Sequence, residues 1–408
     1  MTEPGVNGNG GATAPPNPSF SVVNPRLQLA WDATSLYALM FCARYYQLSI
    51  VEGWQAPGGV DLEYGKLFGD AVAAGDRVRA LGGGVAEAQR VSFRWALEHS
   101  GERREICCGG SHTCGQEGCE GAAYEWRPWG GSYHQLWRCT HAPKPGLKRC
   151  EFALAKKWHE PPEPGDTCGA ILPEGKGGGV PCGSLIETKW VWVPESTAKN
   201  RETLLRAVVW YWEEQVGSAV VPVVLPGTAE PGVEVHFVLP LSLKAYTGES
   251  YLICGYLDNV VDWDTDLFIK ERKTTGKALG KDYFAQFSPN VQIDHYDLAA
   301  SIMFSNLPLK GIMLEAHQAL VGAPRFARQF LHRSPEQRAE YWGELVEHWL
   351  PKAEKYAERA YYPMSRSQCR MCDFNSICSK APASRERWLK ADFERRVWNP
   401  LAPRAVEE

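Results

Sequence analysis

The stretch that most constrains the fold covers residues 255–275, GYLDNVVDWDTDLFIKERKTT. Two runs rich in β-branched and aromatic residues stand on either side of an acidic turn, a pattern that predicts a β-hairpin. We expect strands at 251–261 and 267–275, with the tip between Asp264 and Thr265. The second strand ends in three charged residues where a buried strand would continue with apolar ones. These charges therefore point to a function.

The predicted hairpin brings two carboxylates together. With its tip at that position, Asp258 faces Glu271 at a Cβ separation of about 5 Å. Like charges this close repel each other unless a cation lies between them. Because strand side chains alternate, Lys273 shares the face of Glu271. The pattern therefore predicts a Mg²⁺ or Mn²⁺ site with a lysine beside it. The alternative is a solvated strand edge that carries Glu271 and Lys273.

Length and charge narrow the class of protein. The chain has 408 residues, enough for two or three domains, and its net charge of -4 excludes a globally basic polyanion binder. The N-terminus lacks the features of a signal peptide, and no apolar run reaches the roughly 18 residues of a membrane span. We therefore expect a cytoplasmic protein, in the host cytoplasm if the gene is phage-encoded. In a reducing compartment, its thirteen cysteines favour metal binding over disulfides.

Eight of the cysteines fall in a segment rich in glycine and proline, in which neither helical nor strand periodicity persists. This segment is too poor in aliphatic residues to fold by burial alone, so we expect one or two Zn²⁺ ions to hold it. Disulfides are the alternative, and the spacing does not show which ligands share an ion. Its basic and aromatic residues would suit contact with DNA. The cysteines are Cys107, Cys108, Cys114, Cys119, Cys139, Cys150, Cys168 and Cys182.

The rest of the chain shows ordinary periodicity. We expect helices at 36–53, 62–99, 200–215, 289–304 and 335–361, and further strands at 232–241, 310–321 and 325–334. This pattern predicts an α/β core, a mixed central sheet flanked by helices. The expected parts are a disordered leader (1–24), an N-terminal helical region with the first cluster cysteine (25–103), the cysteine-rich insertion (104–190), the core (191–362) and a C-terminal cysteine region with a tail (363–408).

Two motifs carry a family resemblance. Asp258, followed by the triplet 271–273 (Glu-Arg-Lys), resembles the signature of the PD-(D/E)XK nuclease superfamily. Downstream, QIDHY supplies Gln292 and Tyr296, which is similar to the Q-x-x-x-Y helix motif of the RecB-like branch. The resemblance implies a restriction-endonuclease-like core.

The resemblance also implies roles for these residues. Asp258 and Glu271 become metal ligands, with the Arg272 carbonyl offered as a third, and Lys273 becomes the catalytic lysine. Gln292 and Tyr296 would position the active-site strand or the DNA, since a helix places them one turn apart on one face. Without the other motifs, they would be a polar pair on an amphipathic helix.

The two ends of the chain are similar to the family's iron-sulfur motif. Cys42 lies in the first predicted helix, and CRMCDFNSIC supplies Cys369, Cys372 and Cys378. The resemblance to AddB and to CRISPR-associated RecB-like exonucleases implies a structural [4Fe-4S] cluster on these four cysteines. The alternative for the C-terminal three is a zinc site. Cys254, inside a strand pattern, is expected to be a small buried residue.

The chain departs from the family pattern in two places. Ala43 replaces the usual proline after the cysteine, and Gly69 stands where the branch often has a metal-binding histidine. This missing ligand weakens the predicted metal site. The candidates to replace it are Glu63, Asp70, Glu234 and His236.

Together, the motifs predict a metal-dependent DNA exonuclease of phage type, which hydrolyses phosphodiester bonds in single-stranded DNA or at duplex ends. Recombination or replication proteins are candidate partners. The alternative is a non-catalytic zinc and iron-sulfur DNA-binding protein on a decayed nuclease scaffold.

Overall fold

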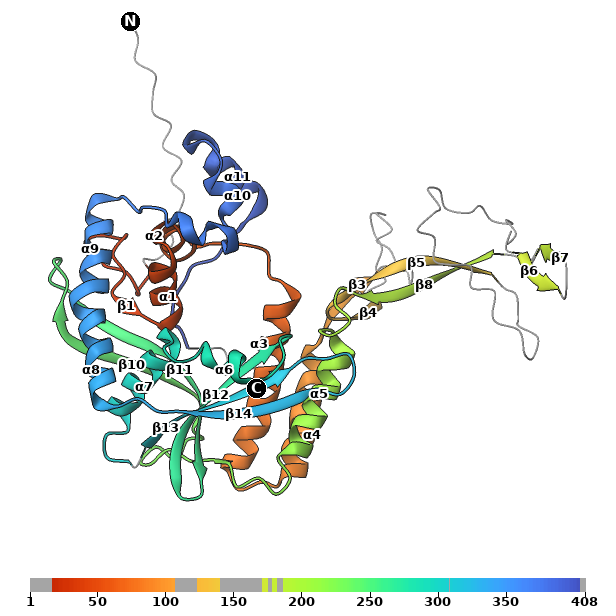
Figure 1. Cartoon of the computed structure of the whole chain (residues 1–408), viewed down its shortest axis with the longest axis horizontal. Helices are drawn as coiled ribbons and strands as arrows, with labels where there is room; N and C mark the ends of the chain where they lie inside the picture. The colour runs from red at the N-terminus through yellow and green to blue at the C-terminus, as the bar shows by residue number, and fades with distance from the viewer. Residues whose placement is uncertain are drawn as a thin grey trace, which may run out of the picture. The chain divides into compact units, whose positions relative to one another are not determined.

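The computed structural model describes residues 17–106, 123–139, 171–174, 178–181, 186–307 and 309–403. The chain divides into two compact units (Figure 1). Unit 1 comprises Met1–His99 with Thr203–Glu408, and unit 2 is Ser100–Glu202.

A seven-stranded mixed sheet forms the centre of unit 1. Its strand order is β1-β11-β12-β13-β14, and β9 and β10 also pair with β11. The β1–β11 and β12–β13 pairs are parallel and the others antiparallel. This arrangement confirms the predicted mixed central sheet. The strands are β1 (Ala30–Trp31), β9 (Val221–Pro222), β10 (Val233–Lys244), β11 (Ser250–Trp263), β12 (Asp266–Thr275), β13 (Leu309–Gln318) and β14 (Arg325–Leu331).

The β11–β12 hairpin confirms the predicted turn. Trp263 pairs with Asp266, which leaves Asp264 and Thr265 as a two-residue tip. Their φ angles are +56° and +72°, as a type I′ turn requires, and that turn matches the twist of the flanking strands. The local pattern thus sets the register of the whole hairpin.

Helices cover both faces of the sheet. On one face, Phe68 of α3 (Val60–Ala80) and Tyr211 of α5 (Arg201–Glu214) pack with rings of β13 and β14. On the other face, α7 (Val291–Met303) buries Ile293 in a core with Ile269 of β12. Two more helices flank these, α4 (Val85–His99), which packs on α3, and α6 (Lys281–Ala285).

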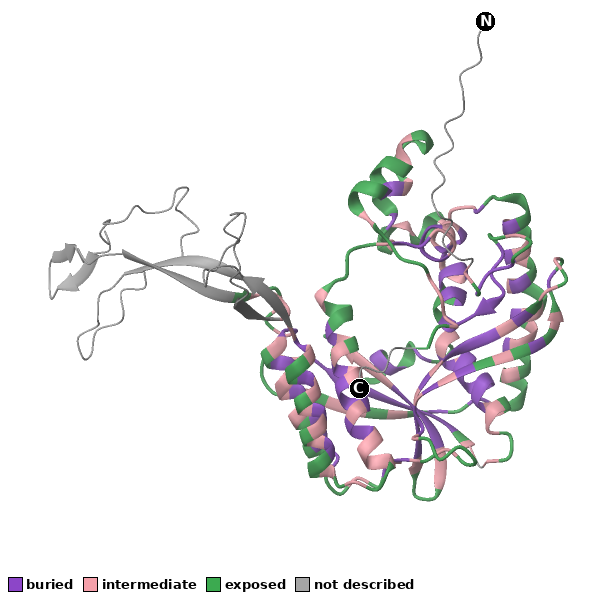
Figure 2. Ribbon diagram, turned by 180° about the vertical axis from the view of Figure 1, so that it is seen from behind, coloured by how far each residue is buried: buried purple, intermediate pink, exposed green. Residues whose placement is uncertain are grey.

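A second core of buried residues lies around the N-terminal helices of unit 1, in the purple ribbon of Figure 2. It joins the first helices to the long helical stretch 335–359, and its largest buried rings include Trp31 and Tyr46, which stack at 5.6 Å. The elements are α1 (Ala33–Phe41), α2 (Ala43–Tyr46), the π-helical η1 (Gln47–Val51), α8 (Pro335–Gly343), the π-helical η2 (Glu344–Trp349) and α9 (Leu350–Arg359).

Three predicted segments differ from the structure. The helix expected over 36–53 breaks at Cys42, whose backbone is extended. The helix expected over 62–99 divides into α3 and α4, because three successive glycines at 82–84 favour a turn. Within the expected disordered leader, Phe20 is buried and pairs with Gln28.

The C-terminal region is built from short elements. Its last described strand pairs with β2 (Trp54–Gln55), so Glu394 and Arg395 are tied to the segment after η1. The elements are η3 (Arg366–Met371), α10 (Asn375–Cys378), η4 (Pro382–Ser384), α11 (Arg385–Asp392) and β15 (Glu394–Arg395).

Among its described residues, unit 2 contains three two-stranded antiparallel sheets, although its sequence showed no persistent strand period. Several of these strands are short or carry consecutive charged residues, as GERREI does, so an apolar alternation is weak in them. Seven of the eight predicted zinc cysteines lie outside the described residues, and Cys139 ends β5. The strands are β3 (Gly101–Ile106), β4 (Ala123–Pro128), β5 (Gly131–Cys139), β6 (Ile171–Glu174), β7 (Gly178–Pro181) and β8 (Ile186–Pro194).

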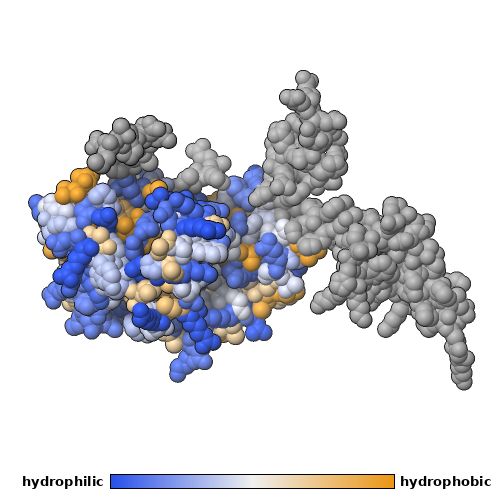
Figure 3. All heavy atoms as spheres, turned by 90° about the horizontal axis from the view of Figure 1, so that it is seen from above, coloured by the Kyte–Doolittle hydropathy of each residue, from blue (hydrophilic) through white to orange (hydrophobic). Residues whose placement is uncertain are grey.

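Within the described part of the chain, none of the helices has the length and apolar character needed to cross a membrane. Where described residues are visible in Figure 3, the surface is mostly hydrophilic, with separate small apolar patches.

Candidate active site

Asp258 lies where the β11–β12 ladder ends. The last ladder pair is Asn259 with Lys270, and the next pair, Asp258 with Glu271, does not form. Instead, the backbone N–H of Arg272 donates to Asp258 Oδ2 at 2.8 Å. The Asp258 carboxylate therefore accepts the hydrogen bond that a backbone carbonyl of β11 would accept if the ladder continued. The predicted register therefore holds as far as Asn259–Lys270, and beyond it the charge of Asp258 still acts on Glu271, whose pKa it helps to raise.

Lys273 contacts Glu271, as their shared strand face predicts. Its Nζ donates to Glu271 Oε1 and, at 2.7 Å, to Gln292 Oε1. The Gln292 amide also donates to Glu271 Oε1 at 2.9 Å and to the Tyr296 hydroxyl at 3.2 Å. Four of the predicted site residues thus form one hydrogen-bonded chain from β12 to α7.

The start of α7 holds Gln292 in place. The Asn290 side chain caps the helix, because its Oδ1 accepts from the N–H groups of Gln292 and Ile293. Tyr296, one turn later, packs edge-on against Phe237 of β10. The i,i+4 spacing in the sequence therefore places Gln292 against Glu271 of β12, with the Tyr296 hydroxyl bonded behind it.

Glu271 has an oxygen that fits a cation. The residue is 2% exposed, and its Oε2 has no hydrogen-bond partner in the described structure. Burial, reinforced by the charge of Asp258, raises the pKa of Glu271 to about 7, and Lys273 offsets this only in part. A divalent cation would pair with this oxygen and would lower that pKa. The hard oxygen ligands suit Mg²⁺ or Mn²⁺.

Gly69, which stands where the family branch often has a histidine, has free space for a side chain. A Cβ built at Gly69 would meet nothing within 4 Å, whereas one at Gly65 would lie 2.7 Å from Thr274 Oγ1. Among the replacement candidates, Glu234 lies between the ladder pairs Val233–Asn259 and Val235–Leu257 and has a φ of +52°. Its negative charge contributes to the raised pKa of Glu271.

The other three candidates are less well placed than Glu234 to replace the histidine. Glu63 is exposed and Asp70 half-buried on α3. His236 stacks on Tyr256 at 4.6 Å. Within the described residues, no group of three or more His, Cys, Asp or Glu side chains is placed to hold a metal ion.

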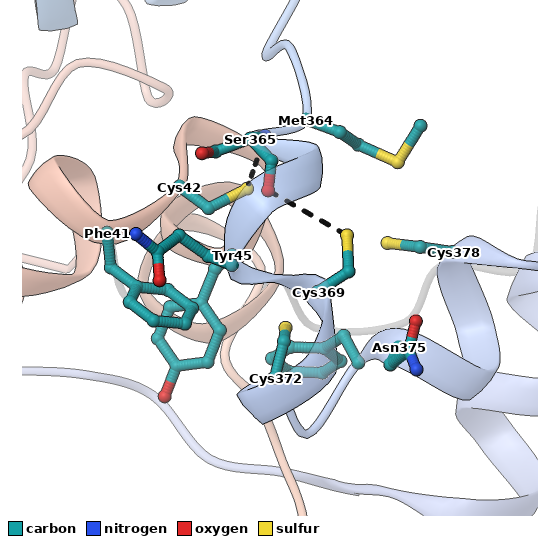
Figure 4. A pocket seen from close by; sticks show the side chains of 11 residues that line it. Phe41, Cys42, Tyr45, Met364, Ser365, Cys369, Cys372, Asn375 and Cys378 are labelled. Atoms are coloured by element: carbon teal, nitrogen blue, oxygen red, sulfur yellow. Dashed lines mark hydrogen bonds between the residues drawn. The ribbon is translucent and has the colours of Figure 1, made fainter.

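The four predicted cluster cysteines line one pocket (Figure 4). The extended backbone at Cys42 interrupts the first helix there, and its sulfur accepts from Ser365 N–H at 3.2 Å. All four are free thiols. The remaining lining residues are Phe41, Tyr45, Met364, Ser365, Gln368, Phe374 and Asn375.

Burial and neighbouring sulfurs disfavour ionised thiols in this pocket. Burial, with the charges of Cys378 and Cys42, raises the pKa of Cys372 to about 11, and burial likewise raises the pKa of Cys378. A cationic group among the sulfurs would reverse both shifts. Cys254 is fully buried in β11, as its strand context predicts.

A buried ion network lies on the opposite face of β12, and the sequence did not reveal it. It contains Lys270 and Arg272, which the alternation places opposite Glu271 and Lys273, and it centres on Asp76 of α3. One signal was present, because Asp76 falls on the same helical stripe as the buried Phe68 and Val72.

Comparisons with known proteins place these residues in a family. The sequence model of the PD-(D/E)XK nuclease superfamily matches residues 92–379, which is more than two thirds of the chain. This range includes Asp258, the α7 motif and the three C-terminal cysteines, and it begins after Cys42.

The comparison with solved structures does not strengthen the family assignment. One match, titled "Crystal structure of SSO0001", is 12% identical and covers 44% of this chain and 76% of its own, with a TM-score of 0.22. No curated protein matches the chain.

Proposed function

The chain belongs to the PD-(D/E)XK nuclease superfamily, and from this premise we propose that it is a metal-dependent DNA exonuclease of the RecB-like type. One observation carries the narrower proposal. Lys273 and Gln292, which come from two separate motifs, both bind Glu271 Oε1. The RecB-like glutamine and the lysine of the general signature thus act on the same carboxylate.

Asp258 and Glu271 are the proposed metal ligands. Arg272 N–H orients the first, and the unpartnered Oε2 of the second offers a free oxygen. When bound, Mg²⁺ or Mn²⁺ would polarise the scissile phosphate and lower the pKa of a coordinated water.

Lys273 is the proposed catalytic lysine. Two oxygens, Glu271 Oε1 and Gln292 Oε1, hold its ammonium group, which leaves donor capacity for a phosphate oxygen or a water. Its charge would offset the negative charge that develops as the phosphodiester bond breaks. Gln292 and Tyr296 fix this arrangement from α7.

A cleavage assay tests the proposal. End-labelled single-stranded and duplex DNA, closed circular DNA and RNA would be incubated with Mg²⁺ or Mn²⁺, and with EDTA as the control. We expect metal-dependent loss of nucleotides from DNA ends and no cleavage of closed circles. Asp258→Ala should abolish cleavage, and Lys273→Ala should slow it by a factor of about 100 while metal binding is retained. Asp262→Ala, a carboxylate nearer the hairpin tip, is the matched control and should cleave like the wild type.

The rival proposal is a non-catalytic zinc and iron-sulfur DNA-binding protein. The absent helix histidine at Gly69 favours it. If neither the wild type nor Asp262→Ala cleaves at any metal concentration while DNA binding persists, this rival replaces the nuclease. Equal cleavage by all variants would assign the activity to a contaminant.

We propose a structural [4Fe-4S] cluster on Cys42, Cys369, Cys372 and Cys378. The supporting observation is that residues more than three hundred positions apart line one pocket with free thiols. Such a staple would tie the N-terminal helices to the C-terminal region. Zinc is the alternative metal, and the free thiols are compatible with the cytoplasmic location we expect.

Metal analysis of anaerobically purified protein separates these possibilities. We expect about four irons per chain with a brown charge-transfer absorbance. A Cys→Ser change at any of the four positions should lose iron and lower stability, whereas Cys254→Ser should keep it. Retained iron in all four variants would refute the cluster. The same analysis counts the one or two Zn²⁺ proposed for the insertion.

A further inference from the structure

The buried ion network behind β12 joins two layers of unit 1, the helices on one face and the central sheet. It crosses from α3 and α5 to the strands β12, β13 and β14, and most of its side chains are fully buried. Its members are Asp76, Tyr211, Lys270, Arg272, Glu315 and Arg328.

Asp76 of α3 is the residue through which this network contacts both strands of the β11–β12 hairpin. Its Oδ2 accepts from Asn259 Nδ2 at 2.5 Å, from the Arg272 guanidinium and from Lys270 Nζ at 3.5 Å. The residue is 2% exposed. One carboxylate oxygen therefore joins α3 to both strands of the central hairpin.

Each residue that Asp76 holds is next to a proposed metal ligand in the sequence. Asn259 follows Asp258 in β11, while Lys270 and Arg272 flank Glu271 in β12. The side chains alternate, so the partners of Asp76 point away from the metal site while the two carboxylates face it. Any shift in these partners would move the ligand backbone.

Arg272 connects the two faces directly. Its guanidinium binds Asp76 and, at 3.4 Å, the Gly69 carbonyl, while its own backbone N–H donates to Asp258 Oδ2 at 2.8 Å. The β11–β12 ladder has already ended at Asn259–Lys270, while the β12–β13 ladder continues through Arg272–Glu315. On the β11 side, the side-chain clamp on α3 therefore takes the place of ladder bonds in fixing the direction of that N–H.

We propose that Asp76 is a positioning residue for the metal site, which holds Arg272 so that the Arg272 amide keeps the Asp258 carboxylate in its metal-binding orientation. This inference rests on the proposed nuclease function. It predicts a loss of metal affinity, whereas a merely structural role for Asp76 would lower stability alone.

The test compares Mn²⁺ binding and cleavage in the full chain. Asp76→Asn keeps the size of the side chain and removes its charge. We expect its Mn²⁺ affinity, measured by calorimetry without DNA, to fall by at least about tenfold, the size of effect that outer-shell partners of metal ligands produce. The cleavage rate at saturating Mn²⁺ should stay within about threefold of the wild type. Hydrogen exchange in the peptide around Arg272 should become faster.

The matched control is Asp297→Asn. Asp297 is also 2% exposed and pairs with Arg338 Nε at 2.5 Å, but its partner lies on α8. This variant should lose comparable stability and keep the wild-type Mn²⁺ affinity. An unchanged affinity in Asp76→Asn, at similar destabilisation, overturns the inference.

A second variant decides the matter if Asp76→Asn does not fold. Arg272→Lys keeps the backbone N–H and a positive charge but loses the guanidinium fork, so we expect the same weakened Mn²⁺ binding. Wild-type affinity in this variant would overturn the inference. If the wild type itself binds no Mn²⁺, the nuclease proposal fails together with the inference. If the wild type binds Mn²⁺ and both variants bind it with the same affinity, the inference alone fails.

Discussion

At the scale of single residues, the carboxylate of Glu271 in β12 lies in an electrostatically unfavourable position in the metal-free protein. Glu271 is buried close to Asp258, and burial together with that charge raises the pKa of Glu271 to about 7. Lys273 binds only one of its two oxygens. Such a site is better suited to a bound cation than to the metal-free protein.

Asp258→Ala should therefore leave the metal-free protein about as stable as the wild type. The change removes the repulsion on Glu271 but leaves the Arg272 N–H without its acceptor, and each effect is worth about 1 kcal/mol. We expect a net change below about 1 kcal/mol in the free energy of unfolding. Urea unfolding in EDTA measures it. A loss above about 2 kcal/mol would show that Asp258 is mainly structural.

Gly69→His should restore a ligand that the family motif leads us to expect. The position is open, and replacing a helix-interior glycine stabilises a helix by a few tenths of a kcal/mol or more. We expect the Mn²⁺ concentration for half-maximal cleavage to fall by about tenfold.

Gly69→Ala is the control, since it shares the helix effect but adds no ligand. If Gly69→His and Gly69→Ala have the same metal requirement, the α3 histidine position does not face the metal in this chain.

At the scale of elements, strand β12 distributes its four successive charges over both faces of the sheet. Glu271 and Lys273 meet α7, while Lys270 and Arg272 meet α3. A buried charge is tolerated only with a partner, and Asp76 and Glu315 supply the partners on the second face. The same alternation thus produces a reactive face and a supporting one.

Glu315 should make stability depend on pH at the acid end. Burial alone would raise its pKa, but Lys270, Arg328 and Arg272 outweigh burial and lower it from 4.5 to about 2. The unfolded chain takes up this proton near pH 4.5, whereas the folded chain resists protonation down to about pH 2. The stabilisation is therefore complete above pH 4.5 and is lost as the pH falls to 2, and it amounts to roughly 3 kcal/mol.

Glu315→Gln should be less stable than the wild type near pH 7, and the difference should shrink below pH 4.5. Urea unfolding across this pH range measures the gap, with the exposed Glu340→Gln as the control. A gap that stays constant with pH would contradict the ion-pair account.

At the scale of the whole molecule, the two ends of unit 2 lie close together in space. Trp129 N–H donates to the Ser100 carbonyl at 3.0 Å, and a Cβ at the next residue, Gly130, would lie 3.2 Å from Asn200 Cα. The two ends are therefore close enough for a short linker. Insertions of this kind are tolerated because closing a longer loop costs little extra free energy.

Replacing residues 101–199 with a short Gly/Ser linker should leave unit 1 folded. We expect the melting temperature to stay within about 5 °C of the wild type and metal-dependent cleavage to persist. The same linker variant with Asp258→Ala serves as the inactive control. Aggregation of the shortened chain would show that unit 1 depends on the insertion.

The sequence alone determined what depends on neighbouring residues. The Asp264–Thr265 tip, the register of β11 with β12 and the i,i+4 pair on α7 follow from turn geometry and side-chain periodicity, which act over a few residues. The shared face of Glu271 and Lys273 follows for the same reason.

Only the tertiary structure decided the contacts between distant segments. Asp76 and Arg272 are 196 positions apart, and Cys42 lies 323 positions from Ser365, whose N–H its sulfur accepts. The β11–β12 ladder ends before Asp258, where Arg272 bonds to Asp258 and to Asp76 instead. The sequence could not predict this end, because the Arg272–Asp76 contact joins distant segments. Such pairings depend on which helix packs on which face of the sheet, and that choice reflects the fit of whole surfaces rather than any local pattern.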